Sequence, residues 1–378
     1  MINKNRLIKL TQELIRIDSQ NPPGNECRIA YFVKDKLKKM GLKVKLYEFR
    51  KDRPNVIAYY KSRNPRFSLL ISPHLDTVPA GSGWKFNPFS AKIYKGKIYG
   101  RGATDCKGNL AIGMEVINSL TENKIELDYD IIFAATADEE SGSEFGIIPL
   151  LKKRIIKPKL ALILDSDDYK IIIAQKGLIH FKVSITGKKA HGAYPWRGVN
   201  AIDIAAKIIN QLKAYKFHYK PHALLRPPTI NIGTIRGGDK VNMVADWCDF
   251  EVDIRFLPGM RKVDILRDIK KIIQARAKKY SIKIDGTQEP YEIDKDHPLV
   301  SGIRNTNKRI IGRQNLAASE GATVITFFQD LHIPAVAYGC GSGGCAHATN
   351  EYIKIDSLYK GALVLEDFLI TLNRRKNS

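Results

Sequence analysis

Apolar positions recur along the chain at two spacings, and the two kinds of segment alternate through its first half. Apolar residues three or four apart predict helices, whereas short apolar runs bounded by turn residues predict buried strands. The expected helices cover residues 7–17, 26–40, 145–153 and a segment that begins near 110. The expected strands cover residues 42–48, 55–60, 67–72, 131–137 and 160–164, with a hairpin at 93–99. This alternation favours an α/β domain whose sheet is covered on both faces.

The pattern changes near residue 179, where a strand alternates apolar and polar positions as a half-buried strand does. The elements expected from there on are a strand at 181–185, a helix at 201–212, strands at 229–235 and 249–256, a helix at 263–278 and a strand at 281–284. The order β-α-β-β-α-β is typical of a ferredoxin-like fold. We therefore predict that residues 179–290 form a small domain inserted into a larger one, which comprises residues 1–178 and 291–378 and ends in a helix at 355–372.

Composition narrows the class of protein. Of the 378 residues, 44% are hydrophobic and 27% are charged, as in ordinary folded proteins, which excludes a disordered chain and a collagen-like repeat. No apolar run approaches the ~18–20 residues of a membrane-spanning helix, and the amphipathic N-terminal segment does not resemble an export signal. The five cysteines include no CxxC pair, so we expect free thiols and a cytoplasmic location.

The chain is strongly basic, with 62 Lys and Arg against 39 Asp and Glu and a formal net charge of +23. Residues 179–290 are the most densely positive part, with 21 basic against 10 acidic residues. Such an excess is compatible with nucleic acid or acidic substrates as partners. The sequence contains no zinc finger and no aromatic-basic stacking motif, so we favour a solvated lysine-rich surface and do not expect nucleic-acid binding.

Histidine and carboxylate residues follow several of the expected strands. His74 follows the strand at 67–72, the acidic run at 138–140 follows the strand at 131–137, and Asp165 follows the strand at 160–164. Ligands of open α/β sheets lie at such strand ends, and divalent metals remove the repulsion between clustered carboxylates. Histidines together with carboxylates suit zinc better than calcium or magnesium. Each residue alone also fits a structural role, since a lone histidine is more often structural than a ligand.

Four segments carry a more specific signal. Residues 72–79 (Ser-Pro-His-Leu-Asp-Thr-Val-Pro) resemble the GHxDxVP motif of the M20 metallopeptidase family, and residues 99–108, 136–142 and 187–195 resemble its later motifs in the family order. The family includes acetylornithine deacetylase, succinyl-diaminopimelate desuccinylase, aminoacylase and glutamate carboxypeptidase. The resemblance implies an α/β fold of the zinc-hydrolase type with a mixed sheet, and an inserted ferredoxin-like domain that acts as a lid and in dimerisation.

The resemblance also implies a two-metal site. One zinc ion would be bound by His74, Asp105 and Asp165. Asp105 would bridge to a second ion, whose other ligands would be Glu140 and His347, and Co²⁺ or Mn²⁺ could replace zinc. The family's bridging aspartate precedes a cis peptide bond, which here would join Asp105 to Cys106.

Further roles follow from the same resemblance. Asp76 would orient the imidazole of His74, and Glu139 would be the general base that activates the attacking water. His191 would support the oxyanion, across the subunit interface in dimeric members. The residues that would contact the substrate are Arg255, which would bind its carboxylate, Asn242 and Gly321.

Two departures concern the substrate. Deacylases of the family usually have Glu where this chain has Asp165, while aminopeptidase-like members often have Asp. Asp167 and Asp168 lie nearby, but Asp165 directly follows the strand. Many relatives have Asp where this chain has Val324. Both differences affect which acyl group is accepted rather than hydrolysis itself.

The sequence therefore predicts a cytoplasmic, homodimeric two-zinc amidohydrolase that removes the acyl group from a small N-acyl amino acid, of the N-acetylornithine or N-succinyl-diaminopimelate type. One alternative is a dipeptidase, aminopeptidase or carboxypeptidase of the same family, acting on short peptides. Another is a deacylase acting on an acidic amino-group carrier protein, whose attack should weaken sharply with salt. A binding protein without chemistry, on nucleic acid for instance, has no use for the general base Glu139.

Overall fold

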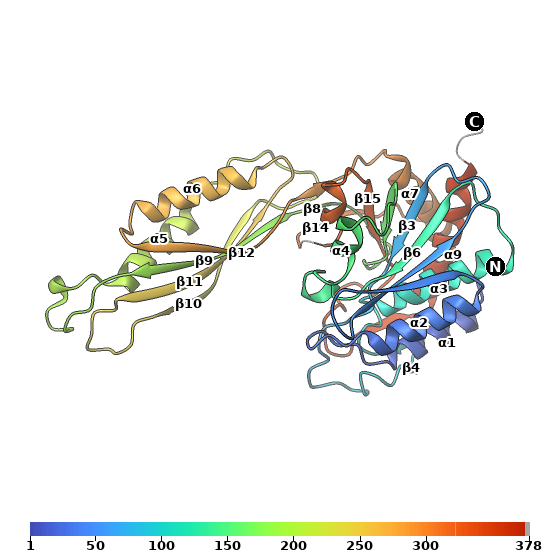
Figure 1. The fold of residues 1–378 in the computed structure, drawn as a ribbon, viewed down its shortest axis with the longest axis horizontal. Helices are drawn as coiled ribbons and strands as arrows, with labels where there is room; N and C mark the ends of the chain where they lie inside the picture. The colour runs from blue at the N-terminus through green and yellow to red at the C-terminus, as the bar shows by residue number, and fades with distance from the viewer. Residues whose placement is uncertain (322, 375–378) are drawn as a thin grey trace. The chain divides into compact units, whose positions relative to one another are not determined.

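The computed structural model describes residues 1–321 and 323–374, which divide into two compact units. The first unit comprises Met1–Ile173, Ile293–Ala317 and the described residues from Phe327 onward. The second comprises Ala174–Glu292 and Ala318–Thr326. Figure 1 labels the elements of both units. No helix in the described ranges is long and apolar enough to cross a membrane.

A mixed sheet forms the centre of the first unit. Seven of its strands lie in the order β1, β2, β6, β3, β7, β15, β8. Their bounds are Lys43–Glu48 (β1), Pro54–Tyr60 (β2), Asp130–Ala135 (β6), Ser68–Ser72 (β3), Leu160–Ile163 (β7), Ala335–Tyr338 (β15) and Ile171–Gln175 (β8). The neighbours β6, β3, β7 and β15 are parallel, and the pairs β1–β2, β2–β6 and β15–β8 are antiparallel. The predicted mixed α/β sheet is therefore confirmed.

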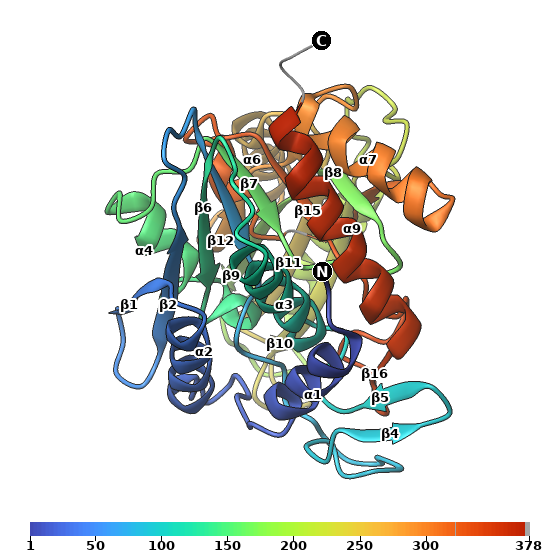
Figure 2. The same cartoon turned by 90° about the vertical axis from the view of Figure 1, so that its right-hand side faces the viewer.

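Helices cover this sheet and bury their apolar faces. Helix α1 contacts α3, α3 contacts α9, and α9 contacts α7, while α2 packs against β1 and β2 (Figure 2). Their bounds are Lys4–Ile15 (α1), Cys27–Lys39 (α2), Lys107–Glu122 (α3), Pro298–Ile311 (α7) and Ile355–Arg374 (α9), and a short helix α4 spans Ile147–Lys152. Helix α3 is buried from Lys107 to Leu120, as expected of a helix that is covered on all sides.

A small sheet joins two segments that are far apart in the sequence. Strand β16 (Tyr352–Lys354) pairs with β5 (Lys97–Tyr99), which forms a hairpin with β4 (Lys92–Tyr94). The segment that follows β5 therefore lies beside the segment that precedes β16. This pairing brings the segment around residue 105 close to the segment around residue 347.

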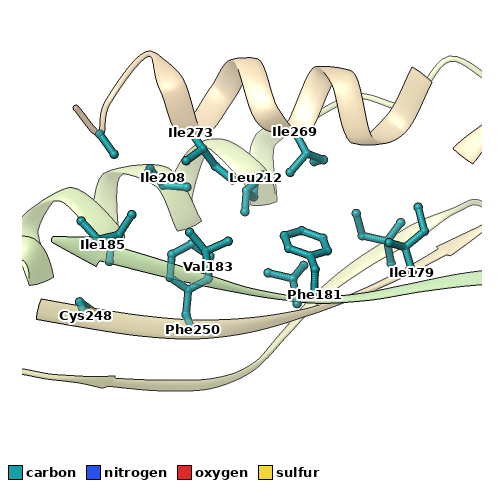
Figure 3. Packing of buried hydrophobic residues seen from close by; sticks show 14 of the residues in the cluster. Ile179, Phe181, Val183, Ile185, Ile208, Leu212, Cys248, Phe250, Ile269 and Ile273 are labelled. Atoms are coloured by element: carbon teal, nitrogen blue, oxygen red, sulfur yellow. The ribbon is translucent and has the colours of Figure 1, made fainter. Parts of the chain in front are cut away.

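The second unit has the element order β9, α5, β10, β11, α6, β12, which is the predicted β-α-β-β-α-β order. Its sheet is ordered β10, β11, β9, β12, and all neighbours are antiparallel. The bounds are Gly177–Thr186 (β9), Ala201–Ala214 (α5), Thr229–Gly237 (β10), Trp247–Phe256 (β11), Lys262–Gln274 (α6) and Tyr280–Gln288 (β12). Alternate residues of β9 are buried, and their side chains meet those of α5 and α6 in one apolar core (Figure 3).

Several elements were not predicted. Strand β8 and strand β15 are short apolar runs of a kind whose periodicity cannot be distinguished from that of a buried helix. Helix α7 begins at Pro298, and the His297 side chain accepts a hydrogen bond from the Leu299 backbone N–H. Proline at the first helical position and a side-chain cap are ordinary start signals, but no helix was predicted there.

Candidate metal centre

The ends of three parallel strands carry the first part of the site. Strand β3 lies between β6 and β7, so the segments that follow these strands meet at one edge of the sheet. His74 follows β3 and forms a parallel bridge with Thr136, just after β6. The Glu139 turn also follows β6, and Asp165 follows β7.

The remaining ligand candidates come from the segments that the small sheet joins. Asp105 lies two residues before the start of α3, and the peptide bond between Asp105 and Cys106 is cis, as the resemblance implies. His347 lies in the loop before β16, where its backbone has a positive φ of 61°. This conformation is uncommon outside glycine and suggests that the loop is closely constrained.

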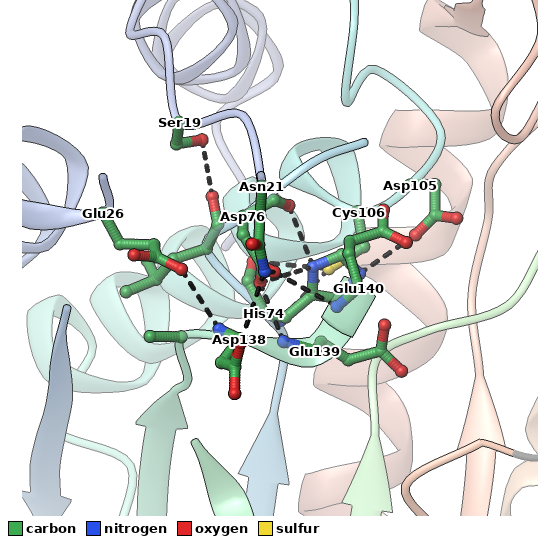
Figure 4. Close-up of polar contacts among 12 residues, drawn as sticks. Ser19, Asn21, Glu26, His74, Asp76, Asp105, Cys106, Asp138, Glu139 and Glu140 are labelled. Atoms are coloured by element: carbon green, nitrogen blue, oxygen red, sulfur yellow. Dashed lines mark hydrogen bonds and ion pairs between the residues drawn. The ribbon is translucent and has the colours of Figure 1, made fainter. Parts of the chain in front are cut away.

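The two oxygens of Asp105 face two different histidines. Its Oδ1 lies 2.9 Å from Nε2 of His74, and its Oδ2 lies 3.2 Å from Nε2 of His347. Nε2 of His347 is also 3.0 Å from Oε2 of Glu140, and Nε2 of His74 is 3.9 Å from Oδ1 of Asp165. Figure 4 shows the side chains of His74, Asp105 and Glu140 near one another.

Within the described part of the chain, two sets of side chains could each hold a metal ion. The first group is His74, Asp105 and Asp165, and the second group is Asp105, Glu140 and His347. In each group the ligand atoms lie within 4.8 Å of one another. Asp105 belongs to both, so its carboxylate can bridge two ions. Two imidazoles and three carboxylates make a donor set that suits zinc and similar ions.

Asp76 links His74 to the neighbouring acidic turn. Nδ1 of His74 lies 3.0 Å from the backbone oxygen of Asp76 and 3.5 Å from its carboxylate. The carboxylate also accepts hydrogen bonds from the backbone N–H groups of Glu139 and Glu140, both at 3.1 Å, and from the Asn21 amide at 2.8 Å. One buried side chain therefore contacts the candidate ligand His74 and the backbone of Glu139 and Glu140 (Figure 4).

A buried charge network lies behind this turn. Nη2 of Arg53 is 2.6 Å from Oε1 of Glu26, and its Nη1 is 2.8 Å from Oδ1 of Asp138. Glu26 also accepts a hydrogen bond from the Asp138 backbone N–H at 3.2 Å. Asp138 itself has a positive φ of 66° and directly precedes Glu139. Glu26 and Arg53 were not predicted from the sequence, because a buried ion pair and a surface one have the same sequence pattern.

The electrostatics of the first group follow from burial and from close charges. Burial raises the pKa of Asp165 to about 7, and the charge of Asp105 adds to the effect. Burial lowers the pKa of His74, but its contacts with Cys106 and Asp105 outweigh this and the net pKa is well above the usual value. The pKa of Asp105 is lowered despite burial, because His347 and His74 both stabilise its anion.

The pKa values of Glu139 and His347 are both raised, but for different reasons. Burial, followed by the charge of Asp165, raises the pKa of Glu139 well above its usual value. The pKa of His347 is raised to about 10 by its hydrogen bonds to Asp105 and Glu140. A carboxylate with a raised pKa is a better proton acceptor near neutral pH, which is the property a general base needs.

The other predicted site residues lie in the second unit. His191 is exposed, its Nδ1 accepts a hydrogen bond from the Ala193 backbone N–H, and its backbone forms an isolated antiparallel bridge with Met243. The backbone N–H of Gly192 donates to the carbonyl of Asn242 at 2.8 Å, so His191 and Asn242 belong to one local cluster.

Arg255 and Gly321 have different surroundings. On β11, Arg255 forms a two-point ion pair with Asp253, with Nε 2.8 Å from one carboxylate oxygen and Nη2 3.2 Å from the other. Its guanidinium fork therefore already faces a carboxylate. Gly321 is exposed and follows Glu320, which is 2.6 Å from Nζ of the buried Lys176. Lys176 was not singled out from the sequence.

Known proteins resemble the chain in sequence and in fold. The sequence model of peptidase family M20/M25/M40 matches residues 70–371. The chain is 28% identical to a succinyl-diaminopimelate desuccinylase of Orientia tsutsugamushi over 95% of this chain and 94% of the relative. It is 31% identical to an acetylornithine deacetylase of Aliivibrio fischeri over 83% of each chain. The crystal structure of an aminopeptidase of Bacillus cereus superposes with a TM-score of 0.82 and 26% identity, covering 98% of this chain and 99% of that one.

Proposed function

The chain belongs to peptidase family M20/M25/M40, and from this premise we propose that it is a two-zinc amidohydrolase that removes the acyl group from an N-acyl amino acid. Members of this family are metal-dependent hydrolases of amide bonds, and the chain is such a hydrolase. N-acetylornithine and N-succinyl-diaminopimelate are the substrate types that we propose, since relatives named for both match most of the chain.

One observation carries the proposal. The two oxygens of Asp105 face the histidines of two separate ligand groups, at 2.9 Å and 3.2 Å. A shared carboxylate of this kind is what a hydrolytic site with two ions about 3.5–4 Å apart requires. Zinc bound there would polarise the amide carbonyl and lower the pKa of a water molecule.

The residues around the ligands supply the rest of the chemistry. Glu139 takes a proton from the attacking water and passes it to the leaving amine, in keeping with its raised pKa. Asp76 holds the backbone of Glu139 and Glu140 in place through its carboxylate. Among the residues of the second unit, we assign oxyanion support to His191. Arg255 would bind the substrate carboxylate in place of its ion pair with Asp253. Asn242 and Gly321 would be further contacts. A cytoplasmic homodimer is part of the same proposal.

A peptidase is the second candidate. Asp165, rather than Glu, is typical of aminopeptidase-like members, and an aminopeptidase superposes on nearly the whole chain. A shorter carboxylate at this position leaves more room beside the first group, and the substrates would then be dipeptides or tripeptides. The two candidates share the metal chemistry and differ only in the substrate.

Hydrolysis by zinc-loaded protein tests both candidates. The substrates are N-acetylornithine, N-succinyl-diaminopimelate, other acyl amino acids and simple peptides, each offered to the wild type and to Glu139→Gln. We expect one acyl amino acid to be hydrolysed and Glu139→Gln to lower kcat by about 10²–10⁴-fold, the usual contribution of a general base. Glu144→Gln is the matched control, since Glu144 is an exposed carboxylate in the same turn region.

The outcomes separate the candidates. Hydrolysis of peptides alone assigns the chain to the peptidases. Hydrolysis that persists in Glu139→Gln removes that residue from the mechanism. If wild-type protein with two ions bound hydrolyses none of the substrates, the proposal of a small-molecule deacylase is wrong.

A further inference from the structure

Glu351 is a buried carboxylate outside both ligand groups, and its side chain is 0% exposed. It lies four residues after His347 and directly before β16. Its Oε1 accepts hydrogen bonds from the backbone N–H groups of Thr104 at 2.8 Å and of Asp105 at 3.0 Å. Its Oε2 accepts from the backbone N–H of Gly102 at 3.0 Å. One side chain therefore holds the whole turn that presents the bridging aspartate.

Arg101 extends this contact to the His347 loop. Its Nη1 donates to Oε2 of Glu351 at 2.7 Å, and its Nη2 lies 3.3 Å from the carbonyl oxygen of His347. Both side chains of the pair are almost fully buried. The pair thus connects the backbone of Asp105 with the backbone of His347, which are ligands of the same group.

Thr104 makes a second connection between the same two segments. Its Oγ1 donates to the carbonyl of Tyr352 at 2.7 Å and accepts from the backbone N–H of Ser342 at 3.0 Å. These two partners lie on either side of His347 in the sequence. The loop is therefore fastened before and after the ligand.

These contacts to the loop matter because the side chain of His347 is itself weakly held. Its side chain is 55% exposed, and its imidazole contacts the two carboxylates of the second group. His74, by contrast, is buried and its Nδ1 contacts a backbone oxygen. The position of the His347 imidazole therefore depends on where its loop is held.

We propose that Glu351, through Arg101 and the turn at residues 102–105, is a positioning residue that sets the affinity of the second ligand group. This inference rests on the proposed two-metal function. A carboxylate that accepts three backbone N–H groups and a guanidinium fixes its donors far better than a neutral amide can. Removing such an outer partner typically weakens metal binding by about 10- to 100-fold.

The test compares two buried glutamates, each paired with an arginine. Glu351→Gln removes the charge of the proposed positioning residue. Glu115→Gln is the matched control: Glu115 is 1% exposed, 2.7 Å from Nε of Arg6, and accepts from the Asn3 backbone N–H, but contacts neither ligand group. Zn²⁺ is titrated into each metal-free protein by calorimetry, with thermal unfolding recorded in parallel.

We expect two binding steps in the wild type and in Glu115→Gln. In Glu351→Gln the weaker step should lose about 10- to 100-fold in affinity while the tighter step changes by less than about threefold. Thr104→Val, which keeps the shape of the side chain but removes the hydroxyl, should shift the same step in the same direction, and it tests the inference if Glu351→Gln does not fold.

The outcomes distinguish this inference from the function it rests on. If the wild type binds two ions but Glu351→Gln and Thr104→Val bind both as tightly as Glu115→Gln, the positioning role is wrong and the proposed function stands. Equal weakening of both steps in Glu351→Gln assigns the residue to general stability and also overturns the inference. Binding of a single ion by the wild type overturns the two-metal function and the inference together.

Discussion

The two ligand groups share Asp105 but are built in different ways. The first group is held by strand ends: His74 is 2% exposed and follows the central strand β3, and Asp165 follows the neighbouring β7. The second group draws His347 from a loop, with 55% of its side chain exposed. Strand ends hold two ligands of the first group, whereas the position of the loop ligand in the second group depends on side-chain contacts.

This difference leads us to expect different behaviour of the two ions. Ligands on rigid elements hold a metal with less loss of conformational freedom than ligands on a loop. We therefore expect the first group to bind more tightly, and the second to exchange its ion more readily and to face the solvent from which water and substrate arrive.

The largest effect is expected from removing the buried histidine. His74→Ala takes away a ligand of the first group and leaves Asp105 and Asp165 to repel each other, which in turn disturbs the bridge to the second group. We expect both ions to bind weakly and turnover to fall by at least ~10³-fold, since a bound metal contributes several kcal/mol to the barrier. Metal content by mass spectrometry under native conditions and steady-state kinetics measure the two effects. Retention of one tight ion in this variant would contradict the ranking of the groups.

A smaller effect is expected at the exposed histidine. His347→Ala removes a ligand that only the second group uses, so we expect one tightly bound ion to remain and turnover to fall by about 10²-fold. The same native mass measurement reports the number of ions. If His347→Ala loses both ions as readily as His74→Ala, the two groups are one cooperative unit and the comparison fails.

The contrast also shows what could be predicted from the sequence. A strand end or the family resemblance indicates each ligand, and the structure brings the five predicted ligand side chains together. The residues that hold these ligands in position could not be predicted in this way. Arg101 and Glu351 are 250 residues apart in the sequence, and only the pairing of β5 with β16 brings them together. A buried glutamate and a solvated one have the same sequence signal until the fold is known.

The same limit applied to the fold. Most of the long helices, α7 excepted, and the β-α-β-β-α-β order were predicted because their periodicity is sustained over many residues. Strand β15 has only four residues, all apolar, and it lies in the middle of the sheet. Its place depends on pairing with β7 and β8, which no local pattern reveals.

The pH dependence of metal binding separates the two groups further. A ligand must lose its proton to bind, and each proton released makes the affinity rise tenfold per pH unit. His74, whose pKa is raised well above its usual value, and Asp165, whose pKa is raised to about 7, both release a proton when the first group binds a metal ion. His347, whose pKa is raised to about 10, does so in the second group. We expect the affinity of the tighter step to rise more steeply below about pH 7 than above it, and that of the weaker step to rise with a single slope. Calorimetric titrations between about pH 5.5 and 8.5 test this, and parallel pH profiles of both steps would contradict it.

The metal-free protein should show the corresponding effect on stability. The pKa of Asp165 is higher in the folded than in the unfolded chain, so between about pH 4 and 7 only the folded state keeps this proton, and stability falls as the pH rises. His347 stabilises the folded state while it is charged, and this contribution is lost as the pH rises toward about 10. Both effects should disappear from melting curves recorded with saturating zinc, which displaces the protons.

The smallest effect concerns two cysteines, one beside each group. Cys106 adjoins Asp105 and is fully buried, and burial raises its pKa to about 12, whereas Cys345 lies two residues before His347 and is half-buried. The thiolate is the form that reacts with alkylating reagents, so we expect iodoacetamide to modify Cys345 and to leave Cys106 unmodified until the protein unfolds. Peptide mapping after timed labelling measures both rates in one sample, and turnover should change by less than about tenfold. Equal labelling of the two thiols would mean that the first group is as open to solvent as the second, which would remove the physical basis for ranking their affinities.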